Sequence, residues 1–303
     1  MHYSVLLNES IELLNIKPDG LYIDGTFGRG GHSQAILERL GSTGRLISFD
    51  KDPEAVEFAS KFASDMRFTI IHDSFANAAI YLDKMNIKKI DGVLLDLGIS
   101  SPQIDTPERG FSFRFDAPLD MRMNNTQGIS AKDWLNTADY QELAKVFWEY
   151  GEEKFSRKIA TRIIEARENK PLQTTSDLAK LVESVISYRE KGQHPATRVF
   201  QATRIYVNNE LNDVEQILND IPPYLSKNGR FVVISFHSLE DRIVKNKFTK
   251  LATGEKLPRW VMANDKPSDY KVIAKKIKAG KEEVDENTRS RSAVMRCLEK
   301  IND

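Results

Sequence analysis

The sequence lacks the features of a secreted, membrane-bound or disulfide-stabilised protein. Its 303 residues include one cysteine, Cys297, so no internal disulfide can form and a reducing compartment is expected. No stretch approaches the roughly 18 consecutive apolar residues that span a bilayer, and the first residues form no basic and apolar leader. The five histidines are scattered without partners at metal-ligand spacing, so no metal is expected. We therefore expect a cytoplasmic protein without membrane contact.

An excess of charge of one sign is also absent. Lys and Arg total 44, as do Asp and Glu, so the net charge of zero does not favour a polyanionic partner. The local balance differs, because Arg242–Arg296 contains 15 basic and 7 acidic residues. This excess is a weak indication of a nucleic-acid partner, and a solvated surface is the simpler explanation.

What the first hundred residues do contain is an alternation of strand and helix patterns. It predicts four short strands, at Leu21–Asp24, Arg45–Asp50, Arg67–Ile71 and Val93–Asp96. Such an alternation is typical of a parallel sheet that helices cover on both faces. Three of these strands end in an aspartate, namely Asp24, Asp50 and Asp96. Because ligands bind at the carboxyl edge of such sheets, the three carboxylates indicate a site there.

The alternation stops after Asp96. Residues 98–128 are rich in turn residues, and residues from 130 to about 219 have an almost entirely helical pattern. Ser130 is the expected N-cap of one helix and Thr137 that of a second, which ends at Gly151. Further helices are expected at 153–168, at 176–187 and from Ala196.

Strand patterns return near the end of the chain. They lie at residues 229–236, 270–277 and 292–298, and we expect the last two to form an antiparallel pair, with irregular chain over 252–270. The simplest assembly is one α/β domain, residues 1–110 and 206–303, interrupted between its fourth and fifth strands by a helical domain, residues 111–205.

The turn after the first strand, Gly25–Gly31, is the strongest local signal for a ligand. Glycines between a strand and a helix let the backbone turn sharply and approach a ligand. Asp50 follows 20 residues after Gly30, where nucleotide-binding folds place a carboxylate that accepts from ribose hydroxyls. The turn is not the dinucleotide fingerprint, because Ser33 stands at the third glycine position, and no Gly-Lys-Ser/Thr of a P-loop follows.

These features predict an adenosine-containing ligand, which leaves NAD, ATP and S-adenosylmethionine open. Pyrophosphate ligands favour a helix N-terminus that is open to phosphate. Asp24 precedes the turn and suits a ligand with a positive end. The methyl donor S-adenosylmethionine is therefore preferred, and an NAD-dependent dehydrogenase is the weaker alternative.

Six motifs in order give the chain a resemblance to a known family. They are Asp24–Ser33, Leu94–Gln103, Glu108–Ser112, Leu119–Met123, His194–Ala202 and Ser235–Arg242. Together they closely resemble the bacterial RsmH family, also called MraW, over nearly the whole chain. The resemblance implies a Rossmann-like class I S-adenosylmethionine-dependent methyltransferase sheet with an inserted all-helical domain. It also implies N4-methylation of one cytidine in the decoding region of 16S ribosomal RNA, within the small ribosomal subunit.

The resemblance also implies which residues bind ligands. The cofactor positions are Gly30, Gly31, His32, Asp50, Phe75, Asp96 and Gln103, with Phe75 expected against the adenine. Asp96 is the candidate catalytic residue, although Asp96–Pro102 lacks the Pro-Pro-aromatic sequence of many amino-methylases, and His237 is a second candidate proton acceptor. Expected RNA contacts are Arg198, Arg289 and Arg291.

Two other functions stay open from the residues alone. One is methylation of DNA or of a small molecule, and the long insert argues against the small molecule. The other is a non-catalytic role in ribosome assembly, against which the intact Asp24, Asp50 and Asp96 speak. The oligomeric state is also open, with a homodimer as one option.

Overall fold

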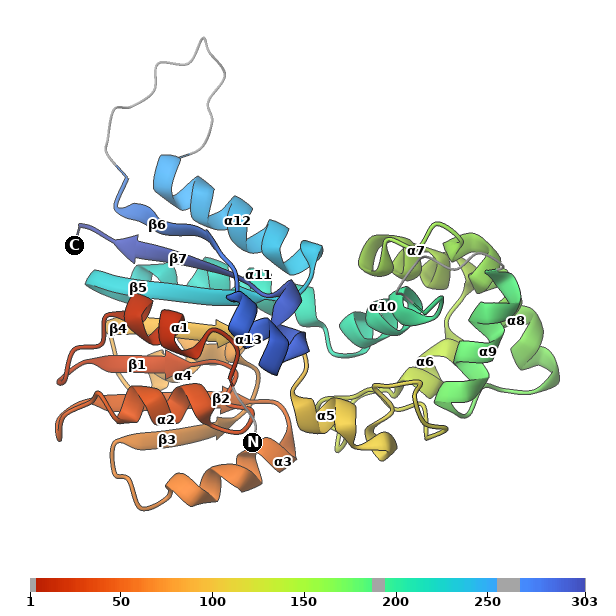
Figure 1. Ribbon diagram of the computed structural model, residues 1–303, viewed down its shortest axis with the longest axis horizontal. Helices are drawn as coiled ribbons and strands as arrows, with labels where there is room; N and C mark the ends of the chain where they lie inside the picture. The colour runs from red at the N-terminus through yellow and green to blue at the C-terminus, as the bar shows by residue number, and fades with distance from the viewer. Residues whose placement is uncertain (1–3, 187–193, 255–267, 303) are drawn as a thin grey trace, which may run out of the picture. The chain divides into compact units, whose positions relative to one another are not determined.

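The computed structural model describes residues 4–186, 194–254 and 268–302 (Figure 1). The chain divides into two units, Met1–Gly98 with Leu211–Asp303, and Ile99–Glu210. Of the segment expected to be irregular, 252–270, residues 255–267 lie outside the described part. That residues 111–205 form a separate domain stays a prediction.

The first unit contains a seven-stranded sheet in the order β3-β2-β1-β4-β5-β7-β6. Strands β1 to β5 are parallel, and β7 is antiparallel to both of its neighbours, β5 and β6. The strands are β1 (Leu21–Asp24), β2 (Arg45–Asp50), β3 (Phe68–His72), β4 (Ile90–Asp96), β5 (Leu225–Ser235), β6 (Tyr270–Ile277) and β7 (Val294–Lys300). Each predicted strand is confirmed with small shifts at its ends, as is the antiparallel pair.

Helices cover both faces of this sheet (Figure 1). Buried residues of α1 (Leu7–Leu14) and α2 (Gly31–Leu37) form one apolar core against it. Buried residues of three further helices form a second apolar core on the opposite face of the sheet. These helices are α4 (Ala78–Lys84), α11 (Glu210–Asp220) and α12 (Ser238–Thr253). The short helices α3 (Pro53–Phe58) and α13 (Lys281–Glu286) follow β2 and β6 in the chain. The sequence pattern did not predict α1.

The strand order brings the three aspartates to one edge. Strands β2, β1 and β4 are neighbours and run parallel, so Asp50, Asp24 and Asp96 lie at adjacent carboxyl ends. This placement confirms the expectation from their positions at the strand ends.

The second unit is helical and has its own apolar core, which includes the fully buried Trp134 and Phe147. Its helices are α5 (Ser101–Asp105), α6 (Ala131–Thr137), α7 (Tyr140–Gly151), α8 (Ser156–Asn169), α9 (Thr175–Val185) and α10 (Thr197–Val207). Within the described part of residues 99–210, no strand joins the sheet.

One predicted helix cap in this unit is wrong. Thr137 is the last residue of α6, and its hydroxyl donates to the Asp133 carbonyl at 2.7 Å. The N-cap of α7 is Asp139, whose side chain accepts from the Glu142 N–H at 2.8 Å. Both residue types are good N-caps, and the turn at Ala138 decides between them, because it leaves only Asp139 extended before the helix.

Among the helices of the described residues, none is long and apolar enough to cross a membrane.

Candidate functional site

The glycine turn between β1 and α2 depends on two left-handed residues. Gly28 and Gly30 have φ angles of +56° and +75°, which L side chains rarely adopt. A Cβ on Gly30 would also lie 2.8 Å from the Phe62 ring. The structure therefore explains these glycines by backbone geometry and internal packing. Close approach of the turn to a ligand stays a prediction.

Asp50, at the end of β2, forms a hydrogen bond with this turn. Its Oδ2 accepts from the Gly28 N–H at 2.7 Å, and its Oδ1 accepts from the Asp52 N–H at 2.9 Å. Burial raises the pKa of Asp50 to about 6. Each carboxylate oxygen can accept a second hydrogen bond, so Asp50 can also bind ribose hydroxyls.

Asp24 is fully buried beneath the turn. Its Oδ2 accepts from the Ser33 hydroxyl at 2.6 Å and its Oδ1 from the Thr26 N–H at 3.1 Å. Burial raises the pKa of Asp24 to about 6. Because Asp24 is fully buried and both of its oxygens are bonded inside the protein, its observed role is to hold the turn and the start of α2 in place.

His32 is a buried, neutral side chain at the start of α2. Its Nε2 lies 3.2 Å from the Val5 carbonyl oxygen. A carbonyl only accepts, so the ring proton is assigned to Nε2 and Nδ1 carries a lone pair. Burial lowers the pKa of His32 to about 4, which keeps the ring uncharged near neutral pH.

Asp96 contains a buried acceptor without a partner. Its Oδ1 has no hydrogen bond to any of the described residues, and its Oδ2 lies 3.8 Å from Nδ1 of His32. The backbone N–H of Asp96 donates to Thr26 Oγ1 at 2.7 Å, which fixes the residue at the end of β4. Burial, followed by the charges of other carboxylates, raises the pKa of Asp96 well above its usual range. This unpartnered oxygen fits a ligand that donates hydrogen bonds.

The residues that pack against the glycine turn from distant parts of the chain were not identified from the sequence. A Cβ on Gly31 would lie 2.0 Å from the Ser4 hydroxyl oxygen, so Ser4 fills the space that this glycine leaves. The Leu6 N–H, in turn, donates to Glu283 Oε1 of α13 at 2.8 Å. No local pattern connects Ser4 or Glu283 with the turn.

Phe75, which the resemblance implies as a cofactor position, lies beside the turn. It begins the 3₁₀ helix η2 (Phe75–Asn77) and is partly buried. Its Cβ would be 2.9 Å from a Cβ added to Gly25. A contact between Phe75 and an adenine ring stays a prediction.

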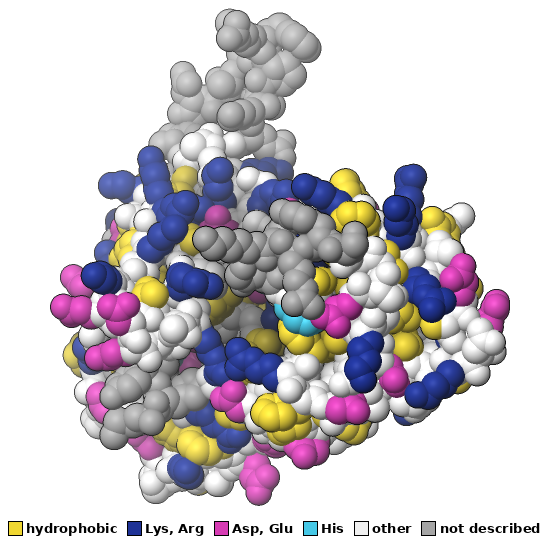
Figure 2. Space-filling model, turned by 45° about the vertical axis from the view of Figure 1, so that its right-hand side comes forward, with side chains coloured by type: hydrophobic (Ala, Val, Ile, Leu, Met, Phe, Trp, Pro, Cys, Tyr) yellow, Lys and Arg dark blue, Asp and Glu magenta, His cyan; other side chains and the backbone are white. Residues whose placement is uncertain are grey.

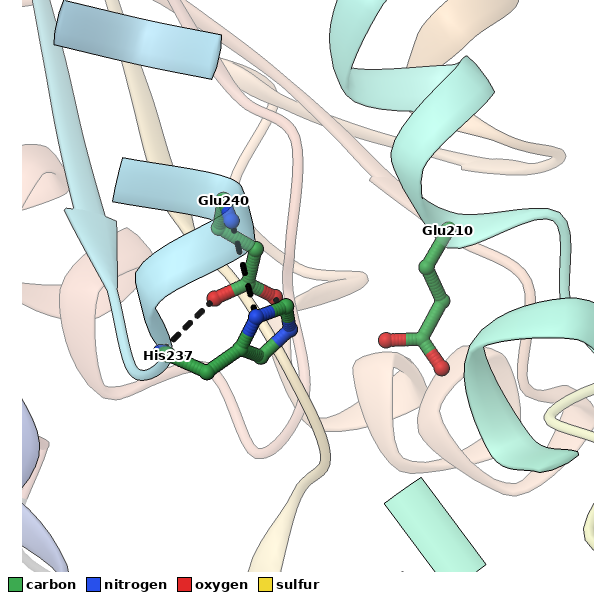
Figure 3. Close-up of side chains that lie close together, drawn as sticks. All are labelled: Glu210, His237 and Glu240. Carbon is green, nitrogen blue, oxygen red and sulfur yellow. Dashed lines mark hydrogen bonds and ion pairs between the residues drawn. The ribbon is translucent and has the colours of Figure 1, made fainter. Parts of the chain in front are cut away.

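His237 follows β5 and caps α12 (Figure 3). Its Nδ1 accepts from the Glu240 N–H at 3.5 Å, and Glu240 Oε2 accepts from the Phe236 N–H at 2.9 Å. His237 Nε2 lies 3.0 Å from Glu240 Oε1 without the alignment of a hydrogen bond. Glu210, also drawn in Figure 3, belongs to the second unit, where Arg204 binds its carboxylate.

The remaining predicted residues lie outside the glycine turn, each within its own unit. Gln103 is buried in the second unit, where its side chain accepts from the Ser100 N–H in a capping box of α5. Arg198 lies in α10 of the same unit, and its carbonyl packs against Gly151. Arg289 and Arg291 lie in the 3₁₀ helix η5 (Thr288–Ser292) of the first unit. Their ligand contacts stay predictions, as does the absence of a metal.

The sheet order, the glycine turn and the carboxylate at the end of β2 define a Rossmann-like nucleotide-binding fold, and the family match adds that the protein is an S-adenosylmethionine-dependent methyltransferase. The model of the MraW methylase family matches residues 1–301. The chain therefore belongs to the MraW methylase family.

Curated relatives are similar over nearly the whole chain. The ribosomal RNA small subunit methyltransferase H of Chromobacterium violaceum is 51% identical over 99% of this chain and 95% of its own length. The proteins of that name from Shewanella woodyi and Neisseria meningitidis serogroup B are 50% and 51% identical, over 99% of this chain and 97% and 92% of their own lengths. Among solved structures, an rRNA methylase from Streptococcus thermophilus has 11% identity and a TM-score of 0.42, covering both chains completely.

Proposed function

We propose that this protein transfers a methyl group from S-adenosylmethionine to the exocyclic N4 of a specific cytidine in the decoding region of 16S ribosomal RNA. The observation that carries the proposal is the buried, unpartnered Oδ1 of Asp96 at the carboxyl edge of the sheet. The relatives named ribosomal RNA small subunit methyltransferase H support the class of substrate. The resemblance noted in the sequence supports the cytidine and its N4.

The residues around the glycine turn fit the cofactor by their chemistry. Asp50 can accept from ribose hydroxyls, Phe75 offers an aromatic face near the turn, and Asp96 with His32 offers acceptors for a donor group. When bound, S-adenosylmethionine supplies a methyl group that is bonded to a sulfonium sulfur, and that sulfur is a good leaving group. The main task of the protein is then to hold the two reactants in line, which can supply up to roughly 7–11 kcal/mol.

The second task is to accept a proton from the amino group. The N4 lone pair of cytosine is delocalised into the ring, and an acceptor beside the N–H bonds helps to localise it. Asp96 Oδ1 is suited to this role because it is buried and unpartnered. His237 is suited less well, because its Nδ1 already accepts from the Glu240 N–H. When Nδ1 of a neutral imidazole accepts this bond, the ring proton is on Nε2, and neither nitrogen has a free lone pair for the amino proton.

In this proposal the second unit recognises the RNA. Arg157 and Lys158 are exposed on α8, which packs against α7, and Trp148 on α7 leaves 59% of its surface exposed. Basic side chains bind phosphates, and exposed aromatic rings stack on unpaired bases. Arg198 on α10 is the basic residue of this unit that is expected from the sequence to contact RNA.

Recognition of this kind depends on local groups and not on overall charge. Figure 2 shows Lys and Arg side chains interspersed with Asp and Glu on the face that it draws, in keeping with a net charge of zero. In the first unit, exposed Arg291 and its neighbour Arg289 add cations outside the second unit. A target base that is unpaired or turned out of its stack lets the enzyme reach the amine, and RNA loops offer such bases at low cost.

Mass spectrometry of 16S RNA from cells that lack this protein tests the proposal. We expect N4-methylcytidine to disappear there, and to return with the wild-type gene but not with Asp96→Asn. Persistence of the modification at the wild-type level, with no second enzyme responsible, would disprove the assignment. Labelled S-adenosylmethionine with 30S subunits, free 16S RNA and DNA distinguishes this function from DNA methylation and from a non-catalytic assembly role. Sedimentation of the purified protein decides whether it is a homodimer.

A further inference from the structure

Asp96 and His32 face each other with two hydrogen-bond acceptors. The Nε2–H of His32 donates a hydrogen bond to the Val5 carbonyl oxygen, with 3.2 Å between the nitrogen and the oxygen, so Nδ1 carries a lone pair. Asp96 Oδ2 lies 3.8 Å from that nitrogen, and Asp96 Oδ1 is buried without a partner. Two acceptors in this arrangement repel each other unless a donor hydrogen lies between them.

The surrounding side chains do not supply this donor. His32 is neutral, because burial lowers its pKa to about 4. The charged groups that act on Asp96 from neighbouring elements are all carboxylates, namely Asp24 of β1, Glu240 of α12 and Glu283 of α13. Together with burial they raise the pKa of Asp96 well above its usual range. The hydrogen between them can come from a proton on Asp96, from water or from an N–H of a bound ligand, and in the ligand-free protein the raised pKa of Asp96 favours the proton on its own carboxyl.

We propose that Asp96 holds a proton in the ligand-free protein and releases it to solvent when a ligand with a protonated amino group binds. The identity of this ligand as S-adenosylmethionine rests on the proposed function. Once ionised, Asp96 accepts from the N–H groups of the ligand, and the positive charge offsets the neighbouring carboxylates. Proton release is the only bond change, and a quarter of the Asp96 side chain is exposed, which gives the proton a route out.

This exchange sets an order of binding for the reaction. A protonated Asp96 cannot take up the amino proton of a nucleobase as a base, and an ionised one can. The proton acceptor therefore forms only after the cofactor has bound, so that productive binding runs from cofactor to RNA.

Calorimetry of S-adenosylmethionine binding to the full chain without RNA tests the proposal. Near pH 7.5, titrations in two buffers of different ionisation enthalpy count the protons released. We expect a net release of up to one proton. The affinity should rise up to tenfold per pH unit until either Asp96 is ionised in the free protein or the amino group of the free ligand loses its proton, at about pH 8. Asp96→Asn should lose both effects. Glu57→Gln is the matched control and should keep them, because it changes an exposed carboxylate on α3 in the same isosteric way.

Infrared difference spectra give a second readout that does not depend on how well the variant binds. The carbonyl stretch of a protonated carboxylic acid should be present in the ligand-free wild type, vanish on adding S-adenosylmethionine and be missing from ligand-free Asp96→Asn. No proton release by the wild type, or no band sensitive to Asp96→Asn, overturns the proposal. If both signals are found but 16S RNA is not methylated, the proposed function fails and the proton exchange stands.

Discussion

The Ser33 hydroxyl donates a 2.6 Å hydrogen bond to Oδ2 of the buried Asp24 and lies 2.9 Å from the Ser48 hydroxyl. Ser33 stands where a dinucleotide-binding turn has its third glycine, so the position is occupied here by a side chain that satisfies a buried carboxylate. Ser33→Ala should lower the free energy of unfolding by about 1.5–3 kcal/mol, as expected for loss of a hydrogen bond to a charged group. Chemical denaturation measures this, with Ser42→Ala on the exposed loop before β2 as the control. Equal stability of the two variants would contradict the role of Ser33.

Asp24 should also make stability depend on pH. Its pKa is raised from 3.8 to about 6 in the folded protein, so the folded state binds the proton more tightly than the unfolded state does. Ionisation of Asp24 therefore lowers the free energy of unfolding as pH rises from about 4 to about 6, by about 3 kcal/mol in total. Asp24→Asn lacks this contribution, so the wild type should gain stability relative to the variant as pH falls through that range. A constant difference between the two proteins would show that Asp24 is not perturbed.

Asp50 should support cofactor binding both directly and through the turn. Asp50→Ala removes the acceptor for the Gly28 N–H and the expected acceptor for the ribose. We expect the affinity for S-adenosylmethionine to fall by about 1.5–3 kcal/mol, measured by calorimetry. Glu57→Ala in the adjacent α3 makes the same change of charge at an exposed position and should bind normally. Unchanged affinity in a folded Asp50→Ala protein would remove Asp50 from the site.

The contact between Gly31 and Ser4 can be tested by a pair of substitutions. In Gly31→Ala the new methyl group would lie 2.0 Å from the Ser4 hydroxyl oxygen. Overpacking of this kind costs about 1–3 kcal/mol, and we expect a loss of stability and of cofactor affinity. Adding Ser4→Ala removes the hydroxyl and should restore part of the loss, whereas Ser4→Ala alone should have little effect. Denaturation measures the free energy of unfolding and calorimetry measures the cofactor affinity. If the effects of the two substitutions on these quantities are additive, Gly31 and Ser4 are not in contact.

The basic residues should contribute to RNA binding in proportion to their phosphate contacts. Arg198→Ala and Arg291→Ala should each weaken 16S RNA binding and lower the slope of its salt dependence by about one unit, with cofactor affinity unchanged. Lys88→Ala is the control, because Lys88 is exposed just before β4, at the amino edge of the sheet. Filter binding over a range of salt concentrations measures the slopes. An unchanged slope assigns the arginine to a role outside the RNA interface.

The sequence predicted the parts of the site that depend on strand ends. A parallel sheet aligns the carboxyl ends of its strands, so apolar segments that end in aspartate were enough to place Asp24, Asp50 and Asp96 together. The glycine turn could also be predicted to lie at this edge, because it follows the end of β1 directly in the chain. Phe75 was singled out only by the resemblance, because β3 lies two strands away from β1 and its position in the chain does not place it beside Gly25.

The rest of the site depends on contacts that no local pattern encodes. Val5 fixes the tautomer of His32 through its backbone carbonyl, which any residue could provide. Glu283 reaches the Leu6 N–H from the other end of the chain. The protonation of Asp96 also depends on carboxylates from three separate elements, and burial cannot be derived from spacing. The cap at Asp139 in place of Thr137 was missed because both residues suit the position and only the turn between them decides.

The pairing of β4 with β5 has a consequence for how the chain folds. Asp96 aligns with Ile234, although all of the second unit lies between them in the chain. Contacts between such distant positions form late, because closing a long loop costs entropy before the ladder gains any hydrogen bonds. The helices of the second unit gather around their own core through shorter-range contacts and can form earlier. We therefore expect the pairing of β5 with β4 to be a late step in folding, whereas the carboxylate edge on β2, β1 and β4 depends on pairings within residues 21–96.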